Sequence, residues 1–268
     1  MRLGIKIGGA QLEDASARDA LAVAVAAAVA DGHRVVIVHG GGNQIRALGR
    51  RLGLGERYHD GLRVTDAATA ELVVQVLAGQ VNKDLVTALN ARQVRAVGLC
   101  GVDGDVFSAR RLAADGVDLG FVGAVHRVDA RLPELLLAQG YTPVIATVAA
   151  LDAAEHGPRE RLYNVNADHA IAPLAAAMHC DAVLFLTDVP AVRGAEGEAL
   201  AELDPRRCAA LRAERIVHGG MIPKLDAALT ALASSPRAIV KIAPAAGDDA
   251  VRNALRDGVG TRFVPDPA

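Results

Sequence analysis

The sequence has few cysteines and no excess of charge of either sign. Its 268 residues include 3 cysteines, Cys100, Cys180 and Cys208, with no Cys-x-x-Cys pair and no Cys/His metal spacing. We expect them to be buried as small apolar side chains. The 8 histidines are also scattered, so no metal site is predicted. The 29 Lys+Arg residues nearly balance the 31 Asp+Glu residues, which argues against a basic face that binds nucleic acid.

Long hydrophobic runs are missing as well. The longest Ala- and Val-rich stretch, residues 21–30, is far shorter than the roughly 18 residues that are needed to cross a bilayer. The segment that begins at Met1 enters a strand-like pattern at once, which leaves no room for a signal peptide. We therefore expect a cytoplasmic protein with no membrane partner.

What the sequence does contain is an alternation of short apolar segments and helical segments. Strands are predicted at residues 3–7, 35–38, 96–99, 142–147, 182–186 and 238–242, and helices at 16–30, 43–52, 66–90, 132–139, 167–178, 204–212 and 222–233. Glycines among β-branched residues predict a hairpin or an exposed meander at 116–128. The alternation indicates an α/β fold with a doubly wound, mostly parallel sheet. A turn-rich segment at 152–161 predicts a boundary between lobes 1–160 and 161–268.

Glycines follow the first two predicted strands. Gly8-Gly9 comes after the first strand, and Gly40-Gly41-Gly42 comes after the second. Ligands bind beyond the carboxyl ends of the strands in open parallel sheets, and bare backbone N–H groups can approach an anion there. The alternative is a tight turn that requires positive φ. Neither cluster has P-loop or dinucleotide-binding spacing, so we predict a phosphate or carboxylate site in one cleft.

Two lysines lie next to glycine turns. Lys6 is inside the apolar first strand, where a buried ammonium without an anionic neighbour or ligand would be strongly unfavourable. Lys224 follows Gly219-Gly220 and lies in the first turn of a predicted helix, where its charge opposes the helix dipole unless an anion binds nearby. The alternative for both is a side chain whose ammonium reaches solvent.

Two further segments could contribute to the same site. Arg63 stands just before a predicted helix and could clamp a carboxylate through its planar guanidinium; the alternative is a part in helix capping. Asn164 and Asn166 alternate like strand residues before a helix whose first turn contains Asp168. For these residues, too, capping is the alternative.

Together, a series of motifs resembles the N-acetylglutamate kinase family in both residues and order. They are Lys6-Ile-Gly-Gly9, His39-Gly-Gly-Gly42, Gly61-Leu-Arg-Val-Thr-Asp66, Asn82-Lys83, Asn164-Val-Asn-Ala-Asp168, Leu186-Thr-Asp-Val-Pro190 and Gly219-Gly-Met-Ile-Pro-Lys224. The resemblance spans about residues 6–260. It implies the amino-acid kinase fold, a three-layer αβα sandwich around a mostly parallel sheet. It also implies transfer of the γ-phosphoryl group of ATP to the side-chain carboxylate of N-acetyl-L-glutamate, the second step of arginine biosynthesis.

The resemblance also implies a role for each matching residue. Lys6 and Lys224 stabilise the transferring phosphoryl group, and Asp168 organises the two lysines. The substrate is held by Gly41, Gly42, Arg63 and Asn164, with Arg63 on the α-carboxylate. ATP is implied to contact Gly8, Gly9, Asp188, Val189, Arg193, Ile216, Val217 and His218, with Mg²⁺ held mainly by the ATP phosphates. Acetylglutamate binding and dimerisation belong to the N-terminal lobe, and ATP binding belongs to the C-terminal lobe.

Two departures from the family pattern bear on assembly and on the C-terminal lobe. Arginine-inhibited members resemble one another in an extra N-terminal helix, whereas here the first strand begins close to Met1. We therefore expect a homodimer that is insensitive to arginine. The segment 239–247 also lacks the Asp-Gly-Arg that follows the corresponding strand in many members.

Two alternative functions share these features. A kinase for aminoadipate or glutamate carried on a small acidic carrier protein resembles this chain in its glycines and both lysines, although the segment 61–66 favours free acetylglutamate. A non-catalytic sensor with a kinase fold could bind ATP or an amino acid. Such a sensor has no need for Lys6, Asp168 and Lys224 together, which favours the enzyme.

Overall fold

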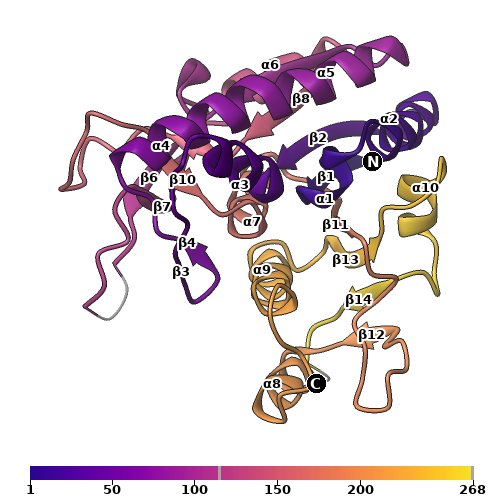
Figure 1. Cartoon of the computed structure of the whole chain (residues 1–268). Helices are drawn as coiled ribbons and strands as arrows, with labels where there is room; N and C mark the ends of the chain where they lie inside the picture. The colour runs from indigo at the N-terminus through magenta and orange to yellow at the C-terminus, as the bar shows by residue number, and fades with distance from the viewer. Residues whose placement is uncertain (114–115, 267–268) are drawn as a thin grey trace.

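A central sheet of eight strands runs through the molecule (Figure 1). The computed structural model describes residues 1–113 and 116–266. The strand order is β12-β14-β13-β11-β1-β2-β8-β5, and the strand pairs are parallel except for β13 with β14. The strands are β1 (Arg2–Ile7), β2 (Arg34–His39), β5 (Ala96–Cys100), β8 (Thr142–Ala146), β11 (Ala182–Thr187), β12 (Glu202–Leu203), β13 (Ile239–Pro244) and β14 (Thr261–Phe263). The predicted α/β class with a mostly parallel sheet is confirmed.

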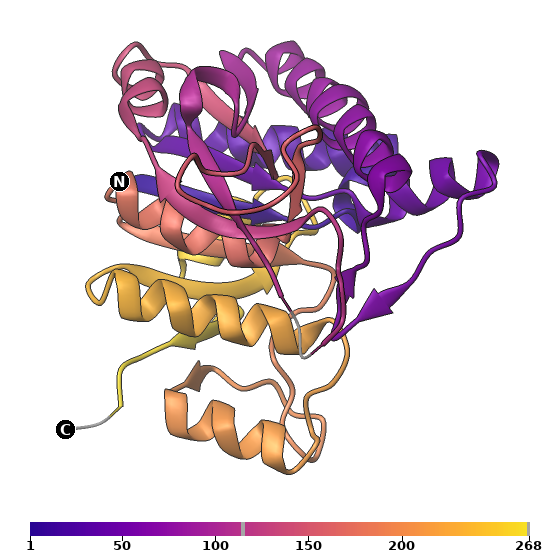
Figure 2. The same cartoon turned by 90° about the vertical axis from the view of Figure 1, so that its left-hand side faces the viewer.

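Helices cover both faces of this sheet (Figures 1 and 2). One face packs against α2 (Ala15–Ala30), α4 (Ala67–Val74), α5 (Asn82–Ala91) and α10 (Ala250–Leu255). The other packs against α6 (Arg131–Ala138), α7 (Ala167–Ala177), α8 (Pro205–Ala213) and α9 (Met221–Ser234). Because successive strand residues point to opposite faces, Ile5 joins the first core. Gly4 faces α7, since a Cβ there would lie 3.3 Å from Ala175 Cβ. The three layers match the predicted sandwich.

The long helical region predicted at 66–90 is helical throughout but changes its winding. The π-helix η1 (Gln75–Val81) joins α4 to α5 without a break. Asp66 is the N-cap, because its Oδ1 accepts a hydrogen bond of 2.8 Å from Thr69 N. The π-helical turn brings Leu77 against the second glycine run, where a Cβ on Gly41 would lie 2.7 Å from Leu77 Cδ2.

Of the hairpin or exposed meander predicted at residues 116–128, the hairpin is wrong. Only β7 (Val122–Val128) is a strand there, and its antiparallel partner is the earlier β6 (Phe107–Arg111). Gly116 and Gly120 have φ values of 76° and 71°, which interrupt extended backbone. Gly120 approaches the carbonyl oxygen of Thr65, where a Cβ would lie only 2.2 Å away. A smaller sheet, β6-β7-β10-β9, adds β10 (Tyr163–Val165) and β9 (Val148–Ala149).

Several short elements have no counterpart in the predicted pattern. They are α1 (Ala10–Glu13), α10, β12, β14, the ribbon of β3 (Tyr58–His59) and β4 (Leu62–Arg63), and the 3₁₀ turn η2 (Asp103–Asp105). Each is too short to show a periodic pattern. The predicted helix at 43–52 corresponds to α3 (Gly42–Arg51). The lobe boundary near residue 160 stays a prediction.

Candidate active site

Two glycine runs lie side by side where neighbouring strands of the central sheet end. β1 and β2 are neighbouring parallel strands with Ile7 opposite His39, so Gly8-Gly9 and Gly40–Gly42 follow them at their carboxyl ends. The runs approach closely, since a Cβ on Gly9 would lie 3.0 Å from Gly42 N. Both runs line one cavity. The predicted meeting of the two clusters in one cleft is therefore observed.

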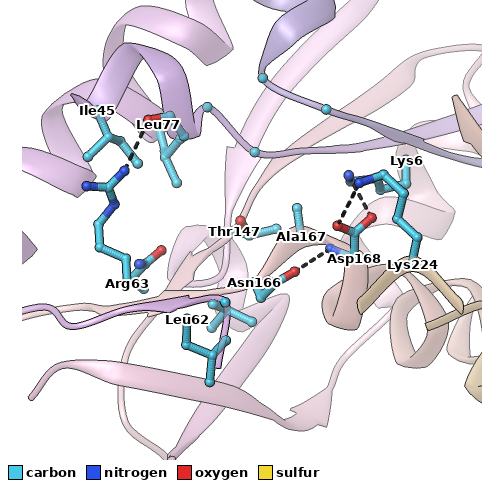
Figure 3. A pocket seen from close by; sticks show the side chains of 18 of the residues that line it. Lys6, Ile45, Leu62, Arg63, Leu77, Thr147, Asn166, Ala167, Asp168 and Lys224 are labelled. Carbon is cyan, nitrogen blue, oxygen red and sulfur yellow. Dashed lines mark hydrogen bonds and ion pairs between the residues drawn. The ribbon is translucent and has the colours of Figure 1, made fainter. Parts of the chain in front are cut away.

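Lys6 and Lys224 meet on the carboxylate of Asp168 (Figure 3). Lys6 Nζ, from the middle of β1, lies 2.7 Å from Asp168 Oδ1. Lys224 Nζ, from the first turn of α9, lies 3.8 Å from Asp168 Oδ2 and donates to Gly220 O at 3.1 Å. Asn166, not Asp168, caps α7, because Asn166 Oδ1 accepts from Asp168 N at 2.8 Å. The Asp168 side chain is thus directed to the lysines.

Burial favours the uncharged forms of Lys6 and Asp168 and so acts on the pKa values of both side chains. It lowers the pKa of Lys6, and Asp168 opposes that effect while Lys224 adds to it. Burial also acts to raise the pKa of Asp168, but the charges of Lys6 and Lys224 outweigh it and keep that pKa below its ordinary value. Two ammonium groups on one carboxylate leave one positive charge in excess within this group of three, and the charge of Asp188 in the same cavity offsets part of it. A bound anion would neutralise that charge.

Arg63 lies on the other side of the same cavity (Figure 3), which Asn164 also lines. Arg63 Nη2 donates to Gly42 O at 3.2 Å, and Nη1 donates to Glu56 Oε2 at 3.1 Å. Asn164, on β10, donates from Nδ2 to Thr65 Oγ1 at 3.3 Å, and Thr65 Oγ1 in turn donates to Arg63 O at 2.7 Å. Since Asp66 caps the following helix, Arg63 has no capping contact of its own.

Every residue predicted for the site lines one of two adjoining cavities. The first, of about 310 Å³, is lined by Lys6, Gly8, Gly9, Gly41, Gly42, Arg63, Asn164, Asp168, Asp188 and Lys224, among others. The second, of about 500 Å³, is lined by Asp188, Val189, Arg193, Ile216, Val217, His218 and Lys224, among others. Thr187, Asp188 and Lys224 belong to both. Lys224 therefore stands where the two cavities meet, and Lys6 lines the first cavity on the other side of the Asp168 carboxylate.

Some residues that line the cavities were not predicted from the sequence. Thr187 ends β11 and lines both cavities, and the rule that ligands bind at the carboxyl ends of strands could have found it. Tyr58 and Gln11 line the first cavity. Tyr58 stands three residues before the glycine of the Gly61–Asp66 motif, which is a weak signal, and no signal marks Gln11.

A buried polar network lies beneath the second glycine run. His39 Nδ1 is 3.0 Å from Gly40 O, so this nitrogen carries the proton, and Nε2 accepts from Asn82 Nδ2 at 3.0 Å. Asn82 Nδ2 also donates to Val144 O at 2.9 Å. Burial lowers the pKa of His39 to about 4. A neutral imidazole therefore ties the glycine run to α5 and β8. Gly98 leaves the space for this contact, because a Cβ there would lie 1.9 Å from Asn82 Oδ1.

The structure also bears on membrane helices, metal sites and the cysteines. In the described part of the chain, no helix is long and apolar enough to cross a membrane. Among the same residues, 1–113 and 116–266, no group of three or more His, Cys, Asp or Glu side chains could hold a metal ion. The three cysteines are buried and free, as expected, and burial raises the pKa of the Cys180 thiol to about 12.

A comparison with protein families identifies the class of protein to which this fold belongs. Residues 1–241 match the model of the amino acid kinase family. The chain therefore belongs to the amino acid kinase family.

Within this family, the chain is similar to proteins of known name. The chain is 42% identical over 245 residues to the acetylglutamate kinase of Acidobacterium capsulatum, with 91% of each protein covered. It is 38% identical to the acetylglutamate kinase of Koribacter versatilis, over 98% of this chain and 99% of that protein. Among solved structures, N-acetylglutamate synthase from Neisseria gonorrhoeae has a TM-score of 0.85 at 22% identity, which shows the fold; this chain covers 60% of it. The resemblance to acetylglutamate kinases that the motifs indicate is thereby confirmed.

Proposed function

We propose that the chain transfers the γ-phosphoryl group of ATP to the side-chain carboxylate of N-acetyl-L-glutamate. The observation that carries the proposal is the Lys6–Asp168–Lys224 group in the first cavity, with distances of 2.7 and 3.8 Å, whose Lys224 also lines the second cavity. The relatives at 42% and 38% identity are acetylglutamate kinases, which supports this substrate.

The chemistry requires charge neutralisation more than proton transfer. A side-chain carboxylate with a pKa of about 4 is already ionised at neutral pH, so its oxygen can attack without a general base. A bond forms between that oxygen and the γ-phosphorus, the bond from the γ-phosphorus to the bridging oxygen breaks, and ADP leaves. Lys6 and Lys224 would flank the group in transfer, and Asp168 holds the two ammonium groups at fixed positions before the anions arrive.

The first cavity suits a small dianion. Its volume of about 310 Å³ is at the lower end of the range for ligand pockets. Arg63 would pair with the α-carboxylate at one side, which leaves the side-chain carboxylate to point toward the lysines at the other. Gly41 and Gly42 line the cavity at the start of α3 and would offer backbone N–H groups, and Asn164 would supply an amide. The arrangement orients the substrate by its two charged ends.

The second cavity suits the nucleotide. Val189, Ile216 and Val217 offer apolar surface for a flat aromatic base. Gly8 and Gly9, at the carboxyl end of β1, leave room for phosphate oxygens near their backbone. Asp188 lies in both cavities and has a carboxylate of the kind that Mg²⁺ binds. We infer that Mg²⁺ is held mainly by the ATP phosphates and supplies charge neutralisation there. The expected homodimer and cytoplasmic location stay predictions.

A hydroxamate assay tests the proposal directly, because hydroxylamine traps an acyl phosphate. Purified protein would be offered ATP with Mg²⁺ and one acceptor: N-acetyl-L-glutamate, N-acetyl-L-2-aminoadipate or glutamate linked to a carrier protein. We expect rapid product only with N-acetyl-L-glutamate. Activity confined to the carrier-linked acceptor would contradict the proposal in favour of the carrier-dependent kinase. Binding of ATP without acyl phosphate from any acceptor would favour the sensor.

A further inference from the structure

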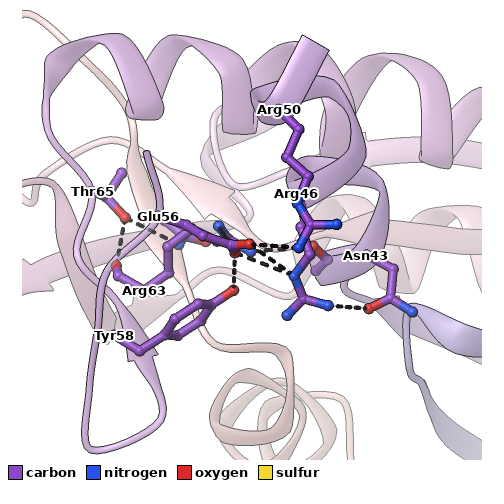
Figure 4. Close-up of polar contacts among 9 residues, drawn as sticks. Asn43, Arg46, Arg50, Glu56, Tyr58, Arg63 and Thr65 are labelled. Carbon is purple, nitrogen blue, oxygen red and sulfur yellow. Dashed lines mark hydrogen bonds and ion pairs between the residues drawn. The ribbon is translucent and has the colours of Figure 1, made fainter. Parts of the chain in front are cut away.

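Just outside the first cavity, the carboxylate of Glu56 contacts the hydroxyl of a tyrosine and the guanidinium groups of three arginines (Figure 4). Its oxygens accept from Arg46 Nε at 3.1 and 3.3 Å and from Tyr58 OH at 3.0 Å. Arg63 Nη1 lies 3.1 Å away, and Arg50 Nη2 lies 3.7 Å away. Glu56 belongs to no motif in the sequence and precedes the β3–β4 ribbon.

The three arginines differ in what they face. The Arg63 side chain is 8% exposed and lines the first cavity, whereas the side chains of Arg46 and Arg50 are 40% and 74% exposed. Arg63 is also held at three points: by Glu56, by Gly42 O, and by the Tyr58 ring, whose centre lies 4.9 Å from the guanidinium carbon. A guanidinium has five N–H donors. The contacts with Glu56 and Gly42 use only two of them, so the others remain for a ligand.

The charges of the group leave Arg63 able to attract an anion. Burial acts to raise the pKa of the Glu56 carboxyl, but the hydrogen bonds from Tyr58 and Arg46 outweigh it and lower that pKa. Glu56 is therefore ionised at neutral pH. Because Arg46 already pairs with it, Glu56 does not cancel the charge of Arg63 alone. It also separates two guanidinium groups that would otherwise repel each other.

We propose that Glu56 is a positioning residue that fixes the Arg63 guanidinium for the α-carboxylate of the substrate. This inference rests on the proposed function. Without the Glu56 carboxylate, Arg63 Nη1 loses its acceptor, and the unshielded Arg46 pushes Arg63 away from the pair. Arg63 would then have to be ordered again when the substrate binds, which weakens binding without changing the lysines that act in transfer.

The test is Glu56→Gln, assayed with two acceptors that differ only at the α-carbon. N-Acetyl-L-glutamate has the α-carboxylate, and 4-acetamidobutyrate lacks it while keeping the acetamido group and the reacting carboxylate. We expect KM for N-acetyl-L-glutamate to rise about five- to twentyfold, with kcat and KM for ATP within about twofold of wild type. For 4-acetamidobutyrate, kcat/KM should be the same in both proteins. Glu71→Gln, an exposed carboxylate on α4, is the matched control and should behave as wild type.

A second variant keeps the inference open to contradiction if Glu56→Gln folds poorly. Tyr58→Phe keeps the ring over Arg63 but removes the hydroxyl that holds Glu56, and it should raise KM for N-acetyl-L-glutamate about two- to threefold. An unchanged or lower KM in Glu56→Gln overturns the inference, as does an equal loss with both acceptors, which would mean a merely structural role. A wild-type chain that phosphorylates neither acceptor overturns the proposed function, and the inference with it.

Discussion

The two cavities that meet at Lys224 are built in different ways. The first is held by side-chain contacts between segments far apart in the chain, such as Arg63 with Gly42, Asn164 with Thr65, and Lys6 with Asp168. The second is lined by two loops that offer mostly apolar side chains: Arg193 Nη1 donates locally to Gly197 O at 2.9 Å, and Val192 N of the same loop donates to the distant Thr261 Oγ1 at 2.8 Å. Fixed charges must be paired even without a ligand. An apolar surface for an aromatic base needs no such partners.

The largest effect is expected where the two cavities meet. Lys224→Met should lower kcat by about 10²–10³, or about 3–4 kcal/mol, because one of the charges that flank the phosphoryl group is lost. Initial rates in the hydroxamate assay measure this. Arg206→Met, which removes an exposed cation of α8, should leave kcat unchanged. A Lys224→Met protein with normal kcat would show that the junction of the cavities is not where transfer occurs.

Part of the acid sensitivity should arise from His39, beneath the glycine run that lines the first cavity. Burial lowers the pKa of His39 from 6.5 to about 4, so the unfolded chain binds a proton in this window that the folded chain does not. The contribution to stability is therefore fully present above pH 6.5 and is lost as the pH falls to about 4, by about 3 kcal/mol.

Urea unfolding of wild type and His39→Gln between pH 7 and 4 tests this expectation. The variant is less stable at neutral pH, and its free energy of unfolding should change less over the window, because the glutamine does not titrate. Parallel curves for the two proteins would show that His39 does not contribute to the pH dependence.

Loss of the Arg63 side chain should change KM for N-acetyl-L-glutamate but not KM for ATP. Arg63→Ala should raise KM for N-acetyl-L-glutamate about ten- to hundredfold, since charged hydrogen bonds contribute about 1.5–3 kcal/mol, and should leave KM for ATP unchanged. Steady-state kinetics with each substrate varied in turn measure both values. Arg57→Ala, an exposed neighbour, serves as the control. An equal rise in both KM values would mean that the two cavities do not act separately.

The smallest effect is expected in the second cavity. Ile216→Ala removes part of an apolar surface and should raise KM for ATP about three- to tenfold, about 1 kcal/mol, through lost burial of the base. KM for N-acetyl-L-glutamate should not change. Leu135→Ala, at an exposed position of α6, is the control. If Ile216→Ala weakened N-acetyl-L-glutamate binding instead, the assignment of ligands to cavities would be reversed.

Local signals were enough for much of the fold and for part of the site. Apolar segments and glycines that follow them predicted the main strands and the edge where the two runs emerge. The unfavourable burial of Lys6 predicted an anionic neighbour, which is Asp168 at 2.7 Å. The choice of Asp168, of Arg63 and of the nucleotide residues came from motifs that resemble a family, since no single spacing identifies them.

Tertiary structure decided what the pattern of residues could not. The partner of β7 is β6 because Gly116 and Gly120 interrupt the chain and Gly120 packs on Thr65. The contacts of Glu56 with Arg63 and of His39 with Asn82 also appear only in the folded chain. A local sequence pattern indicates which side chains are apolar and favour burial and which carry a charge. Which of them touch depends on how distant segments pack, because a hydrogen bond forms only within a few ångströms and at the right angle.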